Sequence, residues 1–348
     1  MYKKIFMGIA AVAALTLVSC SSDDLNSLSD NSSKNEAISF DGYLGRSAVS
    51  VNGSRGSELE IADLQASKDG FGVFGNYSST GNTTAYGENL FKNEQVTYST
   101  PSTSTNTNWT YKNTKYWPTE GHIDFLAYAP YGGETTLKNS KSIDFTVEKE
   151  VANQKDLLWA NAEMQTKSDN PVKFTFYHAL AKIGYTVKTS APYDGTTITL
   201  KSITLAGSKD KTKEAFYTSG TIDLSQKNQA AGLWTNFEGK QNFTWFNGSQ
   251  KVTSTSTGNP NTDYLFVIPQ DFSKTTENAD ELFVIVEYTI QTGETAVMNS
   301  IVSSKLAKSF DQGKAYTINL SLGLTPIEFD VTTVEKWTDG NEEDIPLN

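Results

Sequence analysis

Cys20 is the residue whose type and position point most directly to chemistry, because it is the only cysteine in the 348-residue chain. It ends a segment with a short basic start, Lys3 and Lys4, and an apolar run over residues 5–18. That run is shorter than the roughly 20 apolar residues that a membrane-spanning helix needs. The pattern therefore predicts a removable signal peptide over residues 1–20.

The four residues Leu17-Val18-Ser19-Cys20 look like a lipobox, the sequence at which lipid is attached to a cysteine thiol. The sulfur is diacylated, the peptide before it is cut, and the new amino group is acylated in turn. Several acyl chains give stable anchoring, whereas one chain is marginal. We therefore expect lipidation at Cys20, with outer-membrane lipid as the partner. An ordinary signal peptide that ends in cysteine by chance is the alternative, although a lone cysteine has no disulfide partner.

The other residue types that could do chemistry form no catalytic motif. The two histidines, His122 and His178, are not close in sequence to another histidine or a cysteine that could share a metal ion. The chain has no GxSxG, no HExxH, no P-loop and no GxGxxG after a strand. Two of its many carboxylates could still meet in space as a glycosidase pair. We predict a protein that is not an enzyme, with no catalytic residue, no metal ligand and no cofactor.

Composition indicates a protein outside the cytoplasm. The formal net charge is −11, and loss of Lys3 and Lys4 with the signal peptide makes it −13. An acidic surface disfavours nucleic acid and electrostatic docking on anionic lipid. Without a second cysteine no disulfide can hold the fold together, so stability must come from a core or from assembly. The length suits two domains of ordinary size.

The elements that must position any site are strands. Residues 21–36 are rich in Ser, Asp and Asn and predict a solvated tether. Beyond the tether, short alternating runs of β-branched and aromatic residues are separated by turn residues, which predicts an all-β fold. Clear examples are Ile38–Phe40, Phe71–Phe74, Ile123–Phe125, Val172–Phe176, Ile198–Leu200, Leu265–Ile268, Leu282–Ile290 and Tyr316–Leu322.

The aromatic residues are also compatible with a carbohydrate-binding protein. An exposed ring can pack against the apolar face of a pyranose. Trp109, Trp234 and Trp245 lie in loop-like or polar contexts and are candidates for this role. Burial or half-burial of each ring is the alternative.

Five segments in order resemble those of the Bacteroidales fimbrillin-like proteins, the type V pilins and their Mfa-like and FimA-like relatives. The segments are Trp109–Gly133, Asp156–Ala160, Val172–Ile183, Phe310–Leu320 and Val334–Trp337. The resemblance implies two transthyretin-like β-sandwich domains in series. We expect an N-terminal domain over residues 37–190 and a C-terminal domain over residues 191–348, divided in a turn-rich stretch.

The resemblance also implies a route of assembly. An arginine-specific or trypsin-like protease removes the N-terminal segment of the lipidated precursor, and with it the first strand. The candidate strand carries Ile38 and Phe40 in alternation, and Arg46 follows it between small residues. Arg55 is a second candidate for the cleavage site. The alternative is that both arginines are ordinary solvated loop residues.

Loss of the first strand is expected to leave an open sheet edge and an apolar groove. The resemblance implies that the C-terminal segment of another subunit fills this groove as a strand. Strand addition of this kind combines main-chain hydrogen bonds with pockets for alternate side chains. The candidate donor lies at residues 325–337. Its apolar side chains are Ile327, Phe329, Val331, Val334 and Trp337. The alternative is that this segment is simply the last strand of its own domain.

These observations predict a surface-exposed fimbrial subunit that serves adhesion, as an outer-membrane lipoprotein, in an extracellular fimbrium, or both. Its expected partners are other fimbrial subunits, the same chain or accessory ones, and a host or bacterial surface glycan or protein. A surface carbohydrate-binding lipoprotein, or a fimbrial anchor or tip subunit that does not polymerise, is the alternative. The sequence does not separate the stalk, tip and anchor roles.

Overall fold

The described part of the chain is built almost entirely from β-strands. The computed structural model describes residues 36–44, 61–79, 89–99, 109–133, 139–226, 233–255, 264–294, 297–325 and 330–336. Within these ranges the helical elements are α1 (Ile61–Ala66) and two 3-10 turns, η3 (Val151–Asn153) and η4 (Lys167–Asp169). None of the helices described there is long enough to cross a membrane. The predicted all-β fold class is confirmed.

The N-terminal half forms one sheet of seven described strands, in the order β1-β8-β7-β5-β2-β3-β4. Their bounds are β1 (Phe40–Leu44), β2 (Phe71–Ser78), β3 (Asn89–Tyr98), β4 (Trp109–Tyr111), β5 (His122–Ala129), β7 (Leu158–Gln165) and β8 (Val172–His178). Neighbouring strands run antiparallel, except that β1 runs parallel to β8. The first strand therefore lies at one edge of this sheet.

Side-chain alternation explains how this sheet encloses a core. In β8, Val172, Phe174 and Phe176 are buried, while the residues between them are partly or fully exposed. In β5, all eight residues are buried, so both faces of that strand are covered. Phe125 faces an aromatic core on one side of the sheet, and Leu126 faces a second core on the other side. Period-two burial is what a strand requires to place apolar side chains on one face.

The remaining described strands form three further sheets and one two-stranded ribbon. The sheet orders are β13-β10-β16-β17, β14-β9-β19-β20 and β12-β11-β6, and the ribbon is β15-β18. The bounds are β6 (Ser142–Thr146), β9 (Ala181–Thr189), β10 (Thr196–Ala206), β11 (Phe216–Asp223), β12 (Trp234–Gln241), β13 (Phe243–Val252), β14 (Leu265–Val267), β15 (Gln270–Asp271), β16 (Phe283–Thr292), β17 (Met298–Lys305), β18 (Ser309–Phe310), β19 (Ala315–Leu322) and β20 (Asp330–Lys336).

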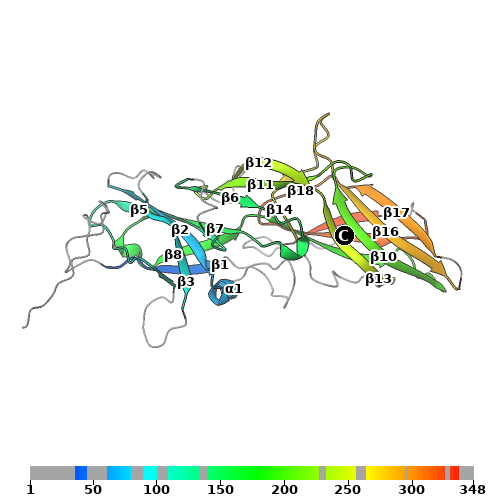
Figure 1. Cartoon of the computed structure of the whole chain (residues 1–348), viewed down its shortest axis with the longest axis horizontal. Coiled ribbons are helices and arrows are strands. Elements are labelled where there is room, and N and C mark those ends of the chain that lie inside the picture. Colours follow the sequence, from blue (N-terminus) through cyan, green and yellow to red (C-terminus); the bar gives the residue numbers. More distant parts are fainter. Residues whose placement is uncertain are drawn as a thin grey trace, which may run out of the picture.

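Strand β6 ties the two halves of the chain together. It lies between N-terminal strands in sequence but pairs with β11, with Ile143 opposite Ile222 and Phe145 opposite Gly220. Trp159 of the N-terminal sheet belongs to the same buried cluster as these C-terminal strands. Figure 1 shows β6, β11 and β12 between the N-terminal sheet at one end and β10, β13, β16 and β17 at the other. The predicted boundary near residue 190 stays a prediction.

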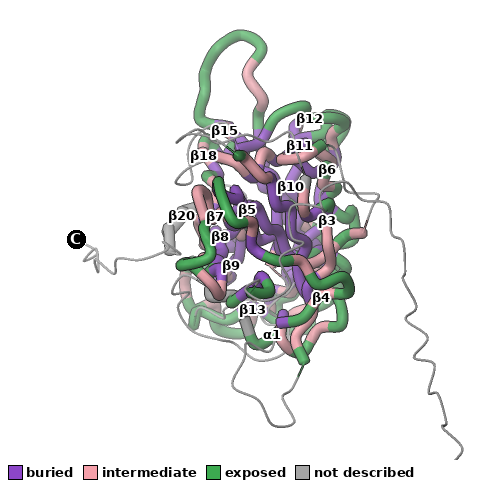
Figure 2. Tube along the Cα trace, turned by 90° about the vertical axis from the view of Figure 1, so that its left-hand side faces the viewer, coloured by how far each residue is buried: buried purple, intermediate pink, exposed green. Residues whose placement is uncertain are grey.

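The molecule is elongated, and its buried residues run along its middle. Figure 1 shows the long axis from the N-terminal sheet to the C-terminal sheets. In the end-on view of Figure 2, buried residues occupy the centre and exposed residues the rim. This shape places β1 and β17 in opposite halves of the molecule.

Candidate functional site

The seat of the first strand is an aromatic cage around Phe40. The Phe40 ring is fully buried, and its centroid lies 5.4 Å from Phe91, 5.5 Å from Phe125 and 5.7 Å from Phe174. The ring of Tyr111 lies 5.6 Å away. These four rings come from β3, β5, β8 and β4. The first strand therefore supplies the central side chain of the N-terminal core.

Backbone hydrogen bonds hold the first strand on both sides. On one side, β1 pairs in parallel with β8 from Phe40 opposite Val172 to Leu44 opposite Phe176. On the other side, the Ile38 amide donates to the Lys115 carbonyl oxygen at 2.9 Å. Lys115 follows β4, the strand at the opposite edge of the sheet. Residues 36–44 therefore join the two edges of the curled sheet.

Asn170 fastens the start of the first strand with its side-chain amide. Its Oδ1 accepts hydrogen bonds from the amide and the hydroxyl of Ser39, both at 2.9 Å. Its Nδ2 donates to Glu36 Oε1 at 2.7 Å and to the Ala37 carbonyl oxygen at 3.2 Å. One side chain thus contacts three residues of the segment that precedes Phe40.

Tyr111 contacts the same segment from the opposite side. Its hydroxyl donates to the Ile38 carbonyl oxygen at 2.8 Å and accepts from the Lys115 amide at 3.1 Å. Burial raises the pKa of Tyr111 to about 12, and the Lys115 hydrogen bond only partly opposes this. The phenol therefore remains a hydrogen-bond donor at neutral pH.

The residues predicted for lipidation and cleavage lie outside the described residues. These are Cys20, Arg46 and Arg55. In the sequence, Arg46 comes two residues after Leu44, the last residue of β1. The structure therefore describes the strand that a cut at Arg46 would separate from the rest of the chain.

The candidate donor segment is only partly described. Val331 and Val334 belong to β20, which pairs antiparallel with β19, so that Val331 lies opposite Leu320 and Val334 opposite Thr317. Ile327, Phe329 and Trp337 lie outside the described residues. Among the described strands, β20 occupies an edge of its sheet, where backbone groups on one side remain available for another chain.

Both histidines face aspartates in buried positions. His178 Nδ1 lies 2.6 Å from Asp156 Oδ2, and Asp156 Oδ1 accepts the Leu157 amide at 2.8 Å. His122 Nε2 lies 3.3 Å from Asp124 Oδ2. All four side chains are at least nine-tenths buried. In the described ranges, His, Cys, Asp and Glu form no group of three that could hold a metal ion.

The tryptophans considered as sugar contacts are buried, and they lie in strands β4, β12 and β13 rather than in loops. Trp109, Trp234 and Trp245 expose 4%, 7% and 5% of their surface. The hypothesis that these three rings stack on sugars is therefore wrong, and the alternative of burial is confirmed. Their polar neighbours are the outward-facing residues of the same strands: in β13, for example, Phe243 and Trp245 are buried while Thr244 between them is exposed.

Sequence reasoning missed the roles of Asn170 and Tyr111. Asn170 lies 131 positions from Ser39, and the Tyr111 hydroxyl reaches Ile38 across 73 positions. The sequence offered a local signal for neither contact. The signal it did offer was the alternation of Ile38 and Phe40, and both side chains are buried.

Comparison with known families and structures gives one family. The family model described as fimbrillin-like matches residues 60–337. A search of curated proteins found no match. A crystal structure of a fimbrial protein from Bacteroides vulgatus ATCC 8482 is similar, with a TM-score of 0.64 and 21% sequence identity. That similarity covers 87% of this chain and 99% of the other.

Two further structures are more distant. A candidate cell adhesion protein from Bacteroides uniformis ATCC 8492 has a TM-score of 0.46 and 16% identity, over 78% of this chain and 93% of that one. The tip fimbrial protein Mfa3 from Porphyromonas gingivalis, with a C-terminal truncation, has a TM-score of 0.37 and 13% identity, over 77% and 93%. The likeness in fold therefore rests on the first structure.

Proposed function

The chain belongs to the fimbrillin-like family, and we propose that it is a fimbrial subunit assembled by exchange of its first strand for a strand of another subunit. The observation that carries the proposal is the position of Phe40, fully buried at the centre of a core that otherwise comes from later strands. A segment that completes a core and is followed by a candidate cleavage site can be replaced as a unit.

Removal of the first strand would open a groove. The backbone edge of β8 and the Lys115 carbonyl oxygen would lose their partners, and the cage around Phe40 would lose its central ring. Refilling the positions of Ile38 and Phe40 with large apolar side chains is worth roughly 1.5–3 kcal/mol for each fully buried residue. An incoming strand that alternates apolar and polar residues meets both requirements.

The donor in this proposal is the segment over residues 325–337. Ile327, Phe329 and Val331 alternate with polar residues, and Val334 and Trp337 extend the apolar pattern. To act as a donor, the part of this segment in β20 must leave β19. Because β20 has one neighbour among the described strands, its release breaks one ladder of hydrogen bonds rather than two.

Export and location follow from the N-terminal segment. The proposal places the precursor at the cell surface, held in the outer membrane by lipid on Cys20, until cleavage after Arg46 or Arg55. The processed subunit then joins other subunits in an extracellular fimbrium that serves adhesion. No chemical step beyond processing is assigned to the chain.

Cleavage of the purified chain that lacks residues 1–20 tests the proposal. An arginine-specific protease is expected to produce a new N-terminus at Ser47 or Gly56, together with a ladder of multimers on an unboiled gel. The variants Arg46→Lys and Arg55→Lys keep the charge but remove each site in turn. The variant that abolishes the ladder identifies the site.

Two other outcomes contradict parts of the proposal. Cleavage without a ladder argues against self-assembly, and a synthetic peptide of residues 325–337 then tests whether the opened groove accepts a strand at all. Resistance at both arginines contradicts processing, and would favour an anchor subunit or a glycan-binding lipoprotein.

A further inference from the structure

An aromatic patch lies on the sheet β12-β11-β6, outside the first-strand seat. We define it as the partly exposed rings of Phe145, Tyr217 and Phe237, together with the buried ring of Trp234, which packs against Phe145 and is not itself offered to a ligand. The rings of Tyr217 and Phe237 stack with centroids 4.7 Å apart and planes at 21°. Phe145 packs edge-on against Trp234 at 6.1 Å. Phe237 is 40% exposed, whereas most of the large aromatic side chains that the structure describes are buried.

Gly220 connects the two ring pairs into one surface. It lies opposite Phe145 in the pairing of β11 with β6. A Cβ atom placed on Gly220 would lie 3.1 Å from Trp234 Cε3 and 3.4 Å from Phe237 Cδ1. The absence of a side chain at this position lets the rings from three strands approach one another. The patch is therefore continuous across the sheet.

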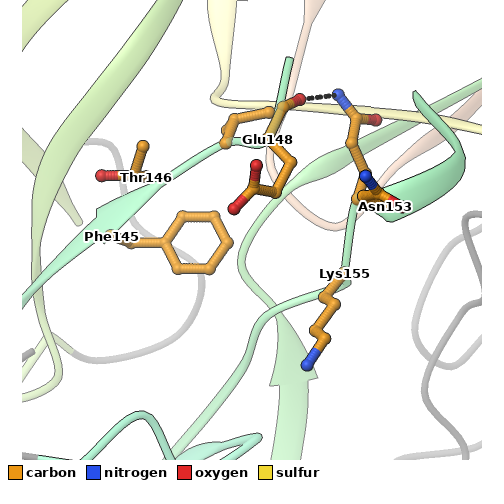
Figure 3. A pocket seen from close by; sticks show the side chains of 7 residues that line it. Phe145, Thr146, Glu148, Asn153 and Lys155 are labelled. Carbon is orange, nitrogen blue, oxygen red and sulfur yellow. Dashed lines mark hydrogen bonds between the residues drawn. The ribbon is translucent and has the colours of Figure 1, made fainter. Parts of the chain in front are cut away.

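A depression of about 320 Å³, lined by both polar and apolar residues, adjoins the patch at Phe145. Its exposed lining residues are Thr146, Glu148, Asn153 and Lys155, which offer a hydroxyl, a carboxylate, an amide and an ammonium group. Figure 3 shows the Phe145 ring and the Glu148 carboxylate facing each other, with Asn153 and Lys155 on the neighbouring segment. The volume lies at the lower end of the range for small-ligand sites, about 300–1,000 Å³.

Buried hydrogen bonds fix the wall of this depression. Gln154 is 4% exposed; its Nε2 donates to the Glu148 carbonyl oxygen at 3.0 Å, and its Oε1 accepts from the Phe266 amide at 2.8 Å. The polar groups on residues 148–155 are therefore held beside the patch by a contact with the C-terminal half. A preformed arrangement of this kind lowers the entropy lost on binding.

We propose that the aromatic patch and the adjoining depression bind a surface glycan through one or two pyranose units. A pyranose has an apolar C–H face that suits the exposed part of Phe237, and hydroxyl groups that need mixed donors and acceptors like those beside Phe145. A stable protein partner usually covers about 800 Å² per side, which a patch with three partly exposed rings does not offer. The small size and mixed polarity favour a sugar.

Glycan binding by the uncleaved chain tests this inference. The chain lacking residues 1–20, with both Arg46→Lys and Arg55→Lys, is applied to an array that carries host and bacterial surface glycans, and hits are titrated by calorimetry. Failure of strand exchange does not affect this measurement, because the protein is never cut. The class of the bound glycans separates a host source from a bacterial one.

Two variants locate the site. Phe237→Ala and Glu148→Ala are each expected to weaken binding by about tenfold, since each removes a contact to the sugar. Ile301→Ala is the matched control, because Ile301 is 68% exposed and belongs to β17, which Figure 1 shows at the end of the molecule away from β12, β11 and β6. Near-ultraviolet circular dichroism and thermal unfolding check that each variant keeps the native fold. The control is expected to bind as the parent does.

Three results would overturn the inference. The first is an array without hits. The second is glycan binding that neither Phe237→Ala nor Glu148→Ala weakens. The third is a Phe237→Ala variant that binds sugars as the parent does but no longer binds a protein or peptide that the parent binds. That result would make the patch a protein contact.

Discussion

At the scale of single residues, the seat of the first strand depends on one ring and one amide. Phe40 fills the cage formed by Phe91, Tyr111, Phe125 and Phe174, and Asn170 holds the residues before it. The ring supplies buried apolar area, whereas the amide supplies direction and register. The two contributions can be measured separately.

Asn170→Ala is expected to loosen the first strand without opening the core. The variant removes hydrogen bonds to Glu36, Ala37 and Ser39, and should lower the stability of the first-strand docking by about 1–3 kcal/mol. Hydrogen exchange at the amides of Ile38 and Val172 measures this, because both donate across the docked strand.

Two variants serve as comparisons for Asn170→Ala. Asn170→Asp keeps acceptors for Ser39 but loses the donors to Glu36 and Ala37, so exchange should be faster than in the parent. Lys251→Ala changes an exposed residue of β13, which does not pair with the first strand, and should leave exchange unchanged. Equal protection in all four proteins would show that Asn170 does not hold the strand.

Tyr111 reports occupancy of the seat through its titration. In the uncut protein its pKa is raised from 10.0 to about 12, with burial as the main cause. Because the folded pKa is raised, the neutral phenol stabilises the fold below pH 10, and this contribution is lost as pH rises towards 12. Carbon NMR of labelled tyrosine rings should show a pKa that falls towards 10 once the first strand leaves. If the pKa of Tyr111 were the same before and after release of the first strand, the strand would not be what buries the phenol.

At the scale of elements, the sequence predicts where strands lie better than it predicts which strands pair with each other. Alternation over Val172–Phe176 is a local signal, and the structure has β8 there with its apolar residues buried. The parallel pairing of β1 with β8 joins residues more than 130 positions apart, and the pairing of β6 with β11 crosses between the halves. Period-two patterning carries no information on which edges meet or in which direction.

The donor role of the C-terminal segment is tested by one side chain. Phe329→Asp is expected to leave cleavage by the arginine-specific protease intact and to abolish the ladder, because a carboxylate cannot enter the apolar cage without a partner. Glu328→Gln changes the polar neighbour on the opposite face of the strand and should keep the ladder. A full ladder from Phe329→Asp would show that another segment is the donor.

At the scale of the whole molecule, one buried cluster spans both halves of the chain. It includes Phe74 and Trp159 from the N-terminal sheet together with residues up to Leu322. The sequence predicts two domains with a boundary near residue 190, and it does not reveal this shared packing, because the residues concerned are far apart along the chain. Contacts between the halves are a tertiary property.

Shared packing predicts that the uncut chain unfolds in a single cooperative transition. Differential scanning calorimetry should give equal calorimetric and van't Hoff enthalpies. Trp159→Ala removes a buried ring from the shared cluster, and large-to-small changes of this type lower the free energy of unfolding by about 3–5 kcal/mol. Two separate transitions in the parent protein would show that the halves fold independently.

The position of the first strand also affects how membrane attachment and fibre length are related. Cys20 and β1 lie on the same side of Arg46 in the chain. In the proposed assembly, a single cut after Arg46 would therefore both open the groove and separate the subunit from its lipid. Each molecule is therefore either anchored to the membrane by its lipid or able to accept a neighbour's strand in its groove, but not both at once. The number of uncut copies would then set the number of fibres attached to the membrane, and the number of cut copies would set their total length. The activity of one protease would therefore set the ratio of fibre length to fibre number.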